Sequence, residues 1–96
     1  MSDTPTAKDW IQIELLEKLI EHYIREVREM QRMVKIAGDH YTYRDKARAC
    51  FILRDDLARF HMEILLYKES TRRIREIEDR VWNDPRYADS REESLT

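Results

Sequence analysis

The chain has 96 residues, of which 40% are charged and 42% are hydrophobic, and its formal net charge is -2. One glycine and two prolines are too few turn residues for a sheet protein, so the composition favours long helices with many ion pairs. The near balance of charge argues against a nucleic-acid-binding or membrane-surface protein. A single cysteine excludes an intrachain disulfide, and no apolar run reaches the ~18 residues of a membrane span. We therefore expect one all-α domain in the cytoplasm.

A heptad pattern organises the first predicted helix, which covers about residues 6–37 after a flexible N-terminus of residues 1–5. Mostly apolar side chains alternate in steps of three and four from Ile13 to Ala37, a spacing typical of coiled coils. Gly38 is expected to end this helix. The short connector that follows predicts that the second helix returns antiparallel to the first, which makes a helical hairpin.

A second stripe on this helix flanks the heptad seam and is apolar only at its two ends. A simple two-stranded seam would leave such a stripe polar throughout. Its ends are therefore predicted to contact something besides the second helix, and we interpret them as partner-binding candidates. These residues are Leu15, Leu19, Met33 and Ile36.

The second predicted helix, about residues 43–82, contains no glycine or proline and is predicted to be continuous. Its first half is apolar around most of its circumference, which one neighbouring helix cannot cover. We therefore predict that two hairpins form a homodimeric four-helix bundle. A bundle completed by helices of another protein is the alternative. The residues assigned to the core or the dimer interface are Phe51, Ile52, Leu57, Phe60, Ile64, Leu65 and Leu66.

The second half of this helix, residues 68–82, is mostly charged and is predicted to extend past the start of the first helix. It is either a docking surface or, if it folds onto residues 5–11, part of the core. The partner-binding candidates in it are Arg72, Arg73, Ile77, Val81 and Trp82. Pro85 ends the helix because the residue before a proline disfavours the α conformation, and residues 83–96 are expected to form a disordered polar tail.

Few residues suggest chemistry. His22 and Glu26 lie one helical turn apart, which is a workable spacing for metal ligands, and His61 falls at the same level of the hairpin. A belt of salt bridges that fixes the register of the helices is the favoured interpretation, because the Glu-x-x-His pairs of di-iron bundles are absent. We predict no catalytic residue, no metal and no cofactor.

These patterns predict a non-enzymatic protein–protein interaction module, such as an adaptor, an assembly factor, a small regulatory or inhibitory subunit, or a chaperone. Its expected partners are a second copy of itself and another protein, and we expect it to bind neither a membrane nor nucleic acid. The competing hypothesis is a helical bundle that binds a metal or cofactor at the mid-level belt of His and carboxylate side chains.

Overall fold

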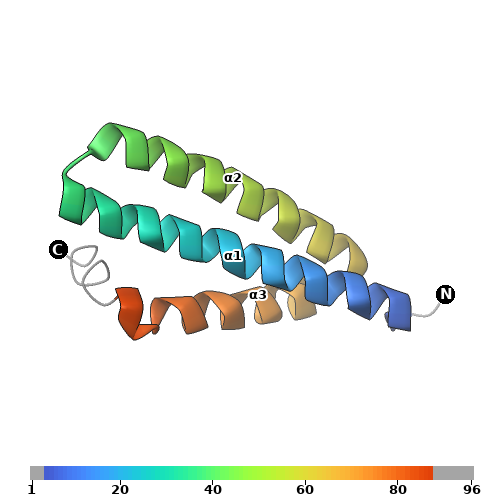
Figure 1. Ribbon diagram of the computed structural model, residues 1–96. Coiled ribbons are helices and arrows are strands. Elements are labelled where there is room, and N and C mark those ends of the chain that lie inside the picture. Colours follow the sequence, from blue (N-terminus) through green and yellow to red (C-terminus); the bar gives the residue numbers. More distant parts are fainter. Residues whose placement is uncertain (1–3, 88–96) are drawn as a thin grey trace.

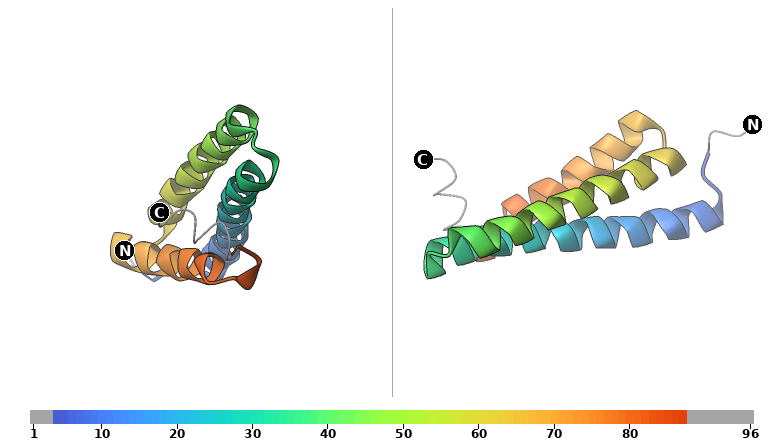
Figure 2. Two further views of the ribbon diagram at one scale, coloured as in Figure 1. Left: turned by 90° about the vertical axis from the view of Figure 1, so that its left-hand side faces the viewer. Right: turned by 90° about the horizontal axis from the view of Figure 1, so that it is seen from above.

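The computed structural model describes residues 4–87, which form three α-helices, one short 3-10 helix and no strand. The elements are α1 (Ala7–Ala37), α2 (His40–Ile64), α3 (Tyr67–Trp82) and the 3-10 helix η1 (Pro85–Tyr87). α2 runs antiparallel beside α1, and α3 turns back to run along α1 (Figure 1 and Figure 2). The all-α prediction is confirmed, whereas the prediction of one continuous helix over residues 43–82 is wrong.

Local signals define both ends of α1. Thr6 and Asp9 form a capping box, in which Thr6 Oγ1 accepts from the Asp9 N–H at 3.2 Å and Asp9 Oδ2 accepts from the Thr6 N–H at 3.0 Å. At the other end Gly38 adopts φ 72°, a left-handed conformation that glycine takes without steric cost. The prediction that Gly38 ends the helix is confirmed. Asp39 then caps α2 by accepting from the Thr42 N–H at 3.0 Å.

The chain leaves the helical conformation at two residues between α2 and α3. Leu65 has φ -112° and ψ 152°, and Leu66 has φ -58° and ψ 146°. The cause lies in the packing, because no glycine or proline is present at the bend. In a continuous helix His61 and Ile74 would be separated by about 3.6 turns and would project to opposite sides. Both side chains are buried in the structure. The bend allows the two faces to be buried in one molecule.

α3 supplies half of the main hydrophobic cluster. The cluster consists of Ile20, Ile24, Ile74, Ile77, Val81 and Tyr87, and Leu57, Ala58 and Met62 pack against it. Ile77 and Val81 are 3% and 0% exposed. Their burial leaves no free surface for docking, which corrects the interpretation of these two residues as partner-binding candidates. They pack against Ile20 and Ile24 in the middle of α1 and not on residues 5–11, because the bend turns α3 back along α1.

The residues after α3 continue the packing for a short distance. Arg25 Nη1 donates to Asp84 Oδ2 at 2.7 Å, and Tyr87 is 3% exposed. Residues 83–87 are therefore ordered against α1, contrary to their prediction as part of a disordered tail. The rest of that tail, residues 88–96, and residues 1–3 of the predicted flexible N-terminus lie outside the described residues.

The substitution Leu66→Pro distinguishes the bend from a continuous helix. Leu66 has φ -58°, close to the value that proline fixes, and Leu65 has the extended conformation favoured before proline. The variant is expected to fold and to gain about 0.4–1 kcal/mol in the free energy of unfolding, measured by urea denaturation. Proline inside a continuous helix costs roughly 3 kcal/mol or more, so a loss of that size would contradict the bend.

Candidate protein-binding surfaces and a buried polar network

An apolar surface runs along α1 and α2, formed by large side chains that α3 leaves exposed. Leu15 and Leu19 of α1 are 58% and 37% exposed, and Leu53 and Phe60 of α2 are 43% and 55% exposed. A groove lies between the two helices, lined by Gln12, Leu15, Leu16, Phe60, Glu63 and Ile64. The residues of this surface, which we call the leucine face, are Leu15, Leu16, Leu19, Leu53, Phe60 and Ile64. Positions three, four and seven apart on a helix share one side, so these residues form one continuous surface.

The residues predicted for the core or the dimer interface divide into three groups. Leu65 is buried, and Leu57 and Ile64 are half-buried. The others are exposed in the single chain, and they are Phe51, Ile52, Phe60 and Leu66. These four side chains do not belong to the core of one chain. Whether a second chain covers them stays a prediction.

The partner-binding candidates at the ends of the α1 stripe also separate. Leu15 and Leu19 are exposed within the leucine face, as described above. Near the other end Met33 is half-buried, and Ile36 is 64% exposed near the connector to α2. The two ends of the stripe therefore do not form one surface.

A second surface, the aromatic cleft, lies where the C-terminal half of α1, the middle of α2 and the end of α3 meet. It is a cavity of about 150 Å³ lined by Ile24, Val27, Arg28, Gln31, Phe51, Arg54, Glu78 and Trp82. Phe51 and Trp82 remain 44% and 38% exposed. Trp82 was a predicted partner-binding residue, and the structure places it in the wall of this cleft.

Arg28 is 1% exposed, and it holds the α3 end of the aromatic cleft in place. Its Nη1 donates to Gln31 Oε1 at 2.6 Å, and its Nη2 donates to the Tyr87 carbonyl oxygen at 3.2 Å. The guanidinium carbon lies 3.8 Å from the centroid of the Trp82 ring. A cation over an indole face is attracted by the ring quadrupole. Arg28 therefore joins α1 to both α3 and η1.

Arg54 forms the α2 wall of the cleft. Its Nη1 donates to Glu78 Oε1 at 2.7 Å, which joins α2 to α3, and its Nη2 lies 2.8 Å from Asp55 Oδ1. The Arg54 guanidinium carbon lies 5.7 Å from the Phe51 ring centroid. Its Nε is buried and has no hydrogen-bond acceptor among residues 4–87. A buried donor in this state costs about 1–3 kcal/mol of desolvation free energy.

A buried polar network lies near the bend and joins all three helices. His61 and Ser70 are both 0% exposed, and Ser70 Oγ lies 2.6 Å from His61 Nδ1. His61 Nε2 lies 2.8 Å from Glu17 Oε2. Arg73 donates to the same carboxylate through Nε at 2.6 Å and Nη2 at 2.8 Å. Arg73, a predicted docking residue, is therefore an internal partner of Glu17 in the single chain.

The Glu17 carboxylate is stabilised in its charged form. Burial on its own would raise the pKa of Glu17, but the hydrogen bonds from Arg73 and His61 and the positive charge of Arg73 outweigh burial and lower the pKa below its ordinary value. The sequence analysis missed Glu17 and Ser70. Glu17 resembles any charged residue on an amphipathic helix, and only the return of α3 brings Ser70 to His61.

The contacts from Ser70 to His61 and from His61 to Glu17 resemble those of the Ser-His-Asp triad of hydrolases. The surroundings of the three side chains, however, are those of a structural network. Ser70 and His61 expose no surface through which a substrate could reach the hydroxyl. Arg73 also neutralises the carboxylate that would have to stabilise a protonated imidazole. The network therefore fixes the bend and the register of α3 against α1.

The metal candidates are not brought together. Both ring nitrogens of His61 are engaged by Glu17 and Ser70, whereas His22 is exposed and packs edge-on against Tyr23 at 5.1 Å between centroids. Glu26 is half-buried on α1. Within the described part of the chain, no group of three or more His, Cys, Asp or Glu residues could hold a metal ion. The competing hypothesis of a metal site at the mid-level belt therefore has no support in residues 4–87.

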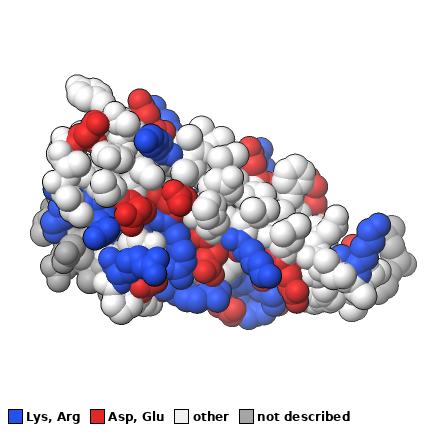
Figure 3. Space-filling model, in the orientation of Figure 1, with Lys and Arg blue, Asp and Glu red and all other residues white. Residues whose placement is uncertain are grey.

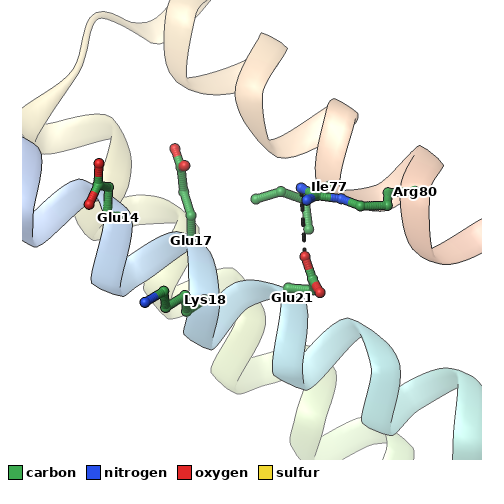
Figure 4. Close-up of a pocket in the computed structure, with 6 residues that line it drawn as sticks. All are labelled: Glu14, Glu17, Lys18, Glu21, Ile77 and Arg80. Atoms are coloured by element: carbon green, nitrogen blue, oxygen red, sulfur yellow. Dashed lines mark ion pairs between the residues drawn. The ribbon is translucent and has the colours of Figure 1, made fainter.

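Charged side chains of both signs line a further pocket, between α1 and α3. Figure 4 shows its lining residues, which are Glu14, Glu17, Lys18, Glu21, Ile77 and Arg80. Arg80 Nη2 lies 3.6 Å from Glu21 Oε1. Arg72, a predicted docking residue, pairs with Glu69 and Glu76 of its own helix. Figure 3 shows basic and acidic side chains intermixed over this part of the surface. Such exposed pairs contribute little stability, and their mixed signs create no strong field.

Comparisons with models of protein families, with curated proteins and with solved structures found no match. None of the helices in the described residues has the length and apolar character needed to cross a membrane.

Proposed function

We propose that this protein is a non-enzymatic protein–protein interaction module that self-associates through the leucine face. The observation that carries the proposal is the exposure of Leu15, Leu19, Leu53 and Phe60 on one continuous side of the α1–α2 pair, at 37–58% each. Single exposed apolar residues are ordinary, but large contiguous apolar surfaces mark interaction sites.

The leucine face is the apolar part of a side of the molecule that is large enough for a stable interface. The molecule is 53 Å long, with shorter dimensions of 23 Å and 19 Å, so one side of the α1–α2 pair measures on the order of 1,000 Å². A stable interface needs about 800 Å² from each partner. Full burial of a Leu, Ile or Phe side chain contributes about 1.5–3 kcal/mol, so a few of these residues are enough to drive association.

A second copy is the partner that best fits this surface. In a two-fold arrangement the same patch is used on both subunits, and an apolar patch is complementary to itself. α1 and α2 of two copies would form a four-helix bundle, with the two α3 helices on its outer sides. The aromatic cleft would remain open in this assembly. Such a module could act as an adaptor, an assembly factor, a small regulatory or inhibitory subunit, or a chaperone.

The substitution Phe60→Glu tests the proposal. A carboxylate at the centre of the leucine face would be desolvated in the interface, so we expect the wild-type protein to sediment as a dimer and the variant to sediment as a monomer. Tyr41→Glu is the matched control because Tyr41 is an aromatic residue of α2 that is 87% exposed and lies outside the leucine face. It should leave the dimer intact. A wild-type monomer at micromolar to millimolar concentration, or a dimer that survives Phe60→Glu, would overturn the proposal.

A further inference from the structure

The bend between α2 and α3 interrupts the helical hydrogen bonds of the backbone. The last bond of α2 runs from the Leu65 N–H to the His61 carbonyl oxygen, and the first bond of α3 runs from the Ser70 N–H to the Leu66 carbonyl oxygen. The N–H groups of residues 66–69 therefore belong to neither helix, and no side chain within the described residues caps the start of α3. A continuous helix would give all of these N–H groups a carbonyl acceptor.

The residues at the bend also permit a straight helix. Residues 64–67 contain no glycine or proline, and leucine is among the better helix-forming residues. Leu66 and Tyr67 are 65% and 70% exposed, whereas Leu65 is 7% exposed. Straightening the bend therefore disturbs the packing of one buried side chain of the bend itself.

The contacts that hold α3 come from residues far away in the sequence. Ile77 packs against Ile20 in the shared cluster. Arg73 donates to the Glu17 carboxylate through Nε at 2.6 Å and Nη2 at 2.8 Å. A second copy of the chain presents the same groups in the same arrangement. The α3 of one copy can therefore take this place on another copy and make the same contacts there, which is the usual basis of domain swapping.

We propose that the surface of α1 and α2 that receives α3 also binds the α3 of a second copy, in a reciprocal exchange that turns α2 and α3 into one continuous helix. The bend lies at one end of the molecule, beside the start of α1 (Figure 1). A straightened α3 leaves its own α1 at this end, so the two copies meet there about a two-fold axis. The exchange uses the side of α1 that faces α3, and it does not use the leucine face.

The exchanged dimer forms when chains fold at high concentration. In dilute solution α3 meets its own α1 first, because the short connection gives it a high effective concentration. Once the molecule is closed, release of α3 breaks the buried polar network and exposes Ile77, so exchange between folded molecules is slow. The protein concentration during folding therefore determines which form is obtained.

Refolding from urea at two concentrations tests the exchange. The chain carries Phe60→Glu, which removes association through the leucine face. Refolding at millimolar concentration should give a dimer that persists on dilution to micromolar concentration and dissociates slowly, whereas refolding at micromolar concentration should give a monomer. Sedimentation velocity separates the two. The same species after both treatments would overturn the exchange. The leucine face is tested separately, by the state of the protein that was refolded at micromolar concentration.

Two substitutions of Leu66 test whether the bend has to straighten. Leu66→Pro in the Phe60→Glu chain should abolish the dimer obtained at millimolar concentration, because proline fits the bend but not the interior of a continuous helix. Leu66→Ala is the matched control, since it removes the same exposed side chain and permits the helix. It should still give the dimer. A dimer that forms equally well with Leu66→Pro would contradict the exchange.

Contacts between chains identify the exchanged segment. A mixture of isotope-labelled and unlabelled Phe60→Glu chains is refolded together at millimolar concentration, and the dimer is isolated. An isotope-filtered nuclear Overhauser experiment should connect the methyl groups of Ile77 in one chain with those of Ile20 and Ile24 in the other, which pack within one chain in the closed molecule. A dimer that lacks these intermolecular contacts would show that α3 is not exchanged.

Discussion

Replacing Ile77 with alanine is expected to lower the free energy of unfolding by about 2–5 kcal/mol, the usual loss for truncating a buried isoleucine. Ile77 is 3% exposed and packs in the cluster shared by α1 and α3. Its burial depends on the return of α3, so this loss measures how much that packing stabilises the molecule. Urea denaturation monitored by circular dichroism gives the value.

Ile52→Ala is the matched control, since it is the same chemical change on a residue that is 56% exposed in one chain. The loss there should stay below about 1 kcal/mol. The sequence pattern does not predict this ranking, because it assigns Ile52 to the core or the dimer interface and Ile77 either to a docking surface or to the core. A larger loss for Ile52→Ala than for Ile77→Ala would therefore contradict the packing of α3 on α1.

Breaking the buried polar network should have the next largest effect. Glu17→Gln removes the charge that binds both His61 and Arg73, and it is expected to lower the free energy of unfolding by about 2–3 kcal/mol, because hydrogen bonds to charged and partly buried groups are the costly ones to lose. Glu69→Gln is the matched control. Glu69 is also held by two nitrogens of one arginine, Arg72, but that pair is exposed, so stability should be nearly unchanged.

The loss from Glu17→Gln should also depend on pH. The pKa of Glu17 is lower in the folded state than its ordinary value of 4.5, so its charged form stabilises the fold above that pH. This contribution is lost as the pH falls below 4.5 and through the folded-state pKa. The difference in stability between wild type and Glu17→Gln should therefore be constant near neutral pH and shrink in acid. A difference that grows in acid would contradict the assigned ion pair.

The bend between α2 and α3 could not be predicted from the sequence. The run from Ile64 to Tyr67 has no glycine, proline or capping side chain, and α3 starts without a side-chain cap. Helix propensity therefore favours continuity, and tertiary packing overrides it. The sequence does contain one signal of the bend. The regular spacing of apolar residues along the second predicted helix changes after Ile74, at Ile77 and Val81. That change marks the apolar stripe moving to another side of the helix.

The candidate surfaces were predictable to different degrees. The excess of apolar side chains on α2 can be recognised in the sequence. The exposure of Phe60 is compatible with burial against a second chain, which stays a prediction. The aromatic cleft, by contrast, could not be predicted from the sequence. Arg28 and Arg54 look like solvent-facing charges on amphipathic helices, and only the position of Trp82 and Glu78 on the returning α3 encloses them.

The central claim is that two copies bury the leucine face against each other. An isotope-filtered nuclear Overhauser experiment on a mixture of labelled and unlabelled protein detects only contacts between chains. It should show intermolecular contacts from the Phe60 ring and from the methyl groups of Leu15, Leu19 and Leu53. The absence of intermolecular contacts at millimolar concentration, or contacts confined to α3, would contradict the account.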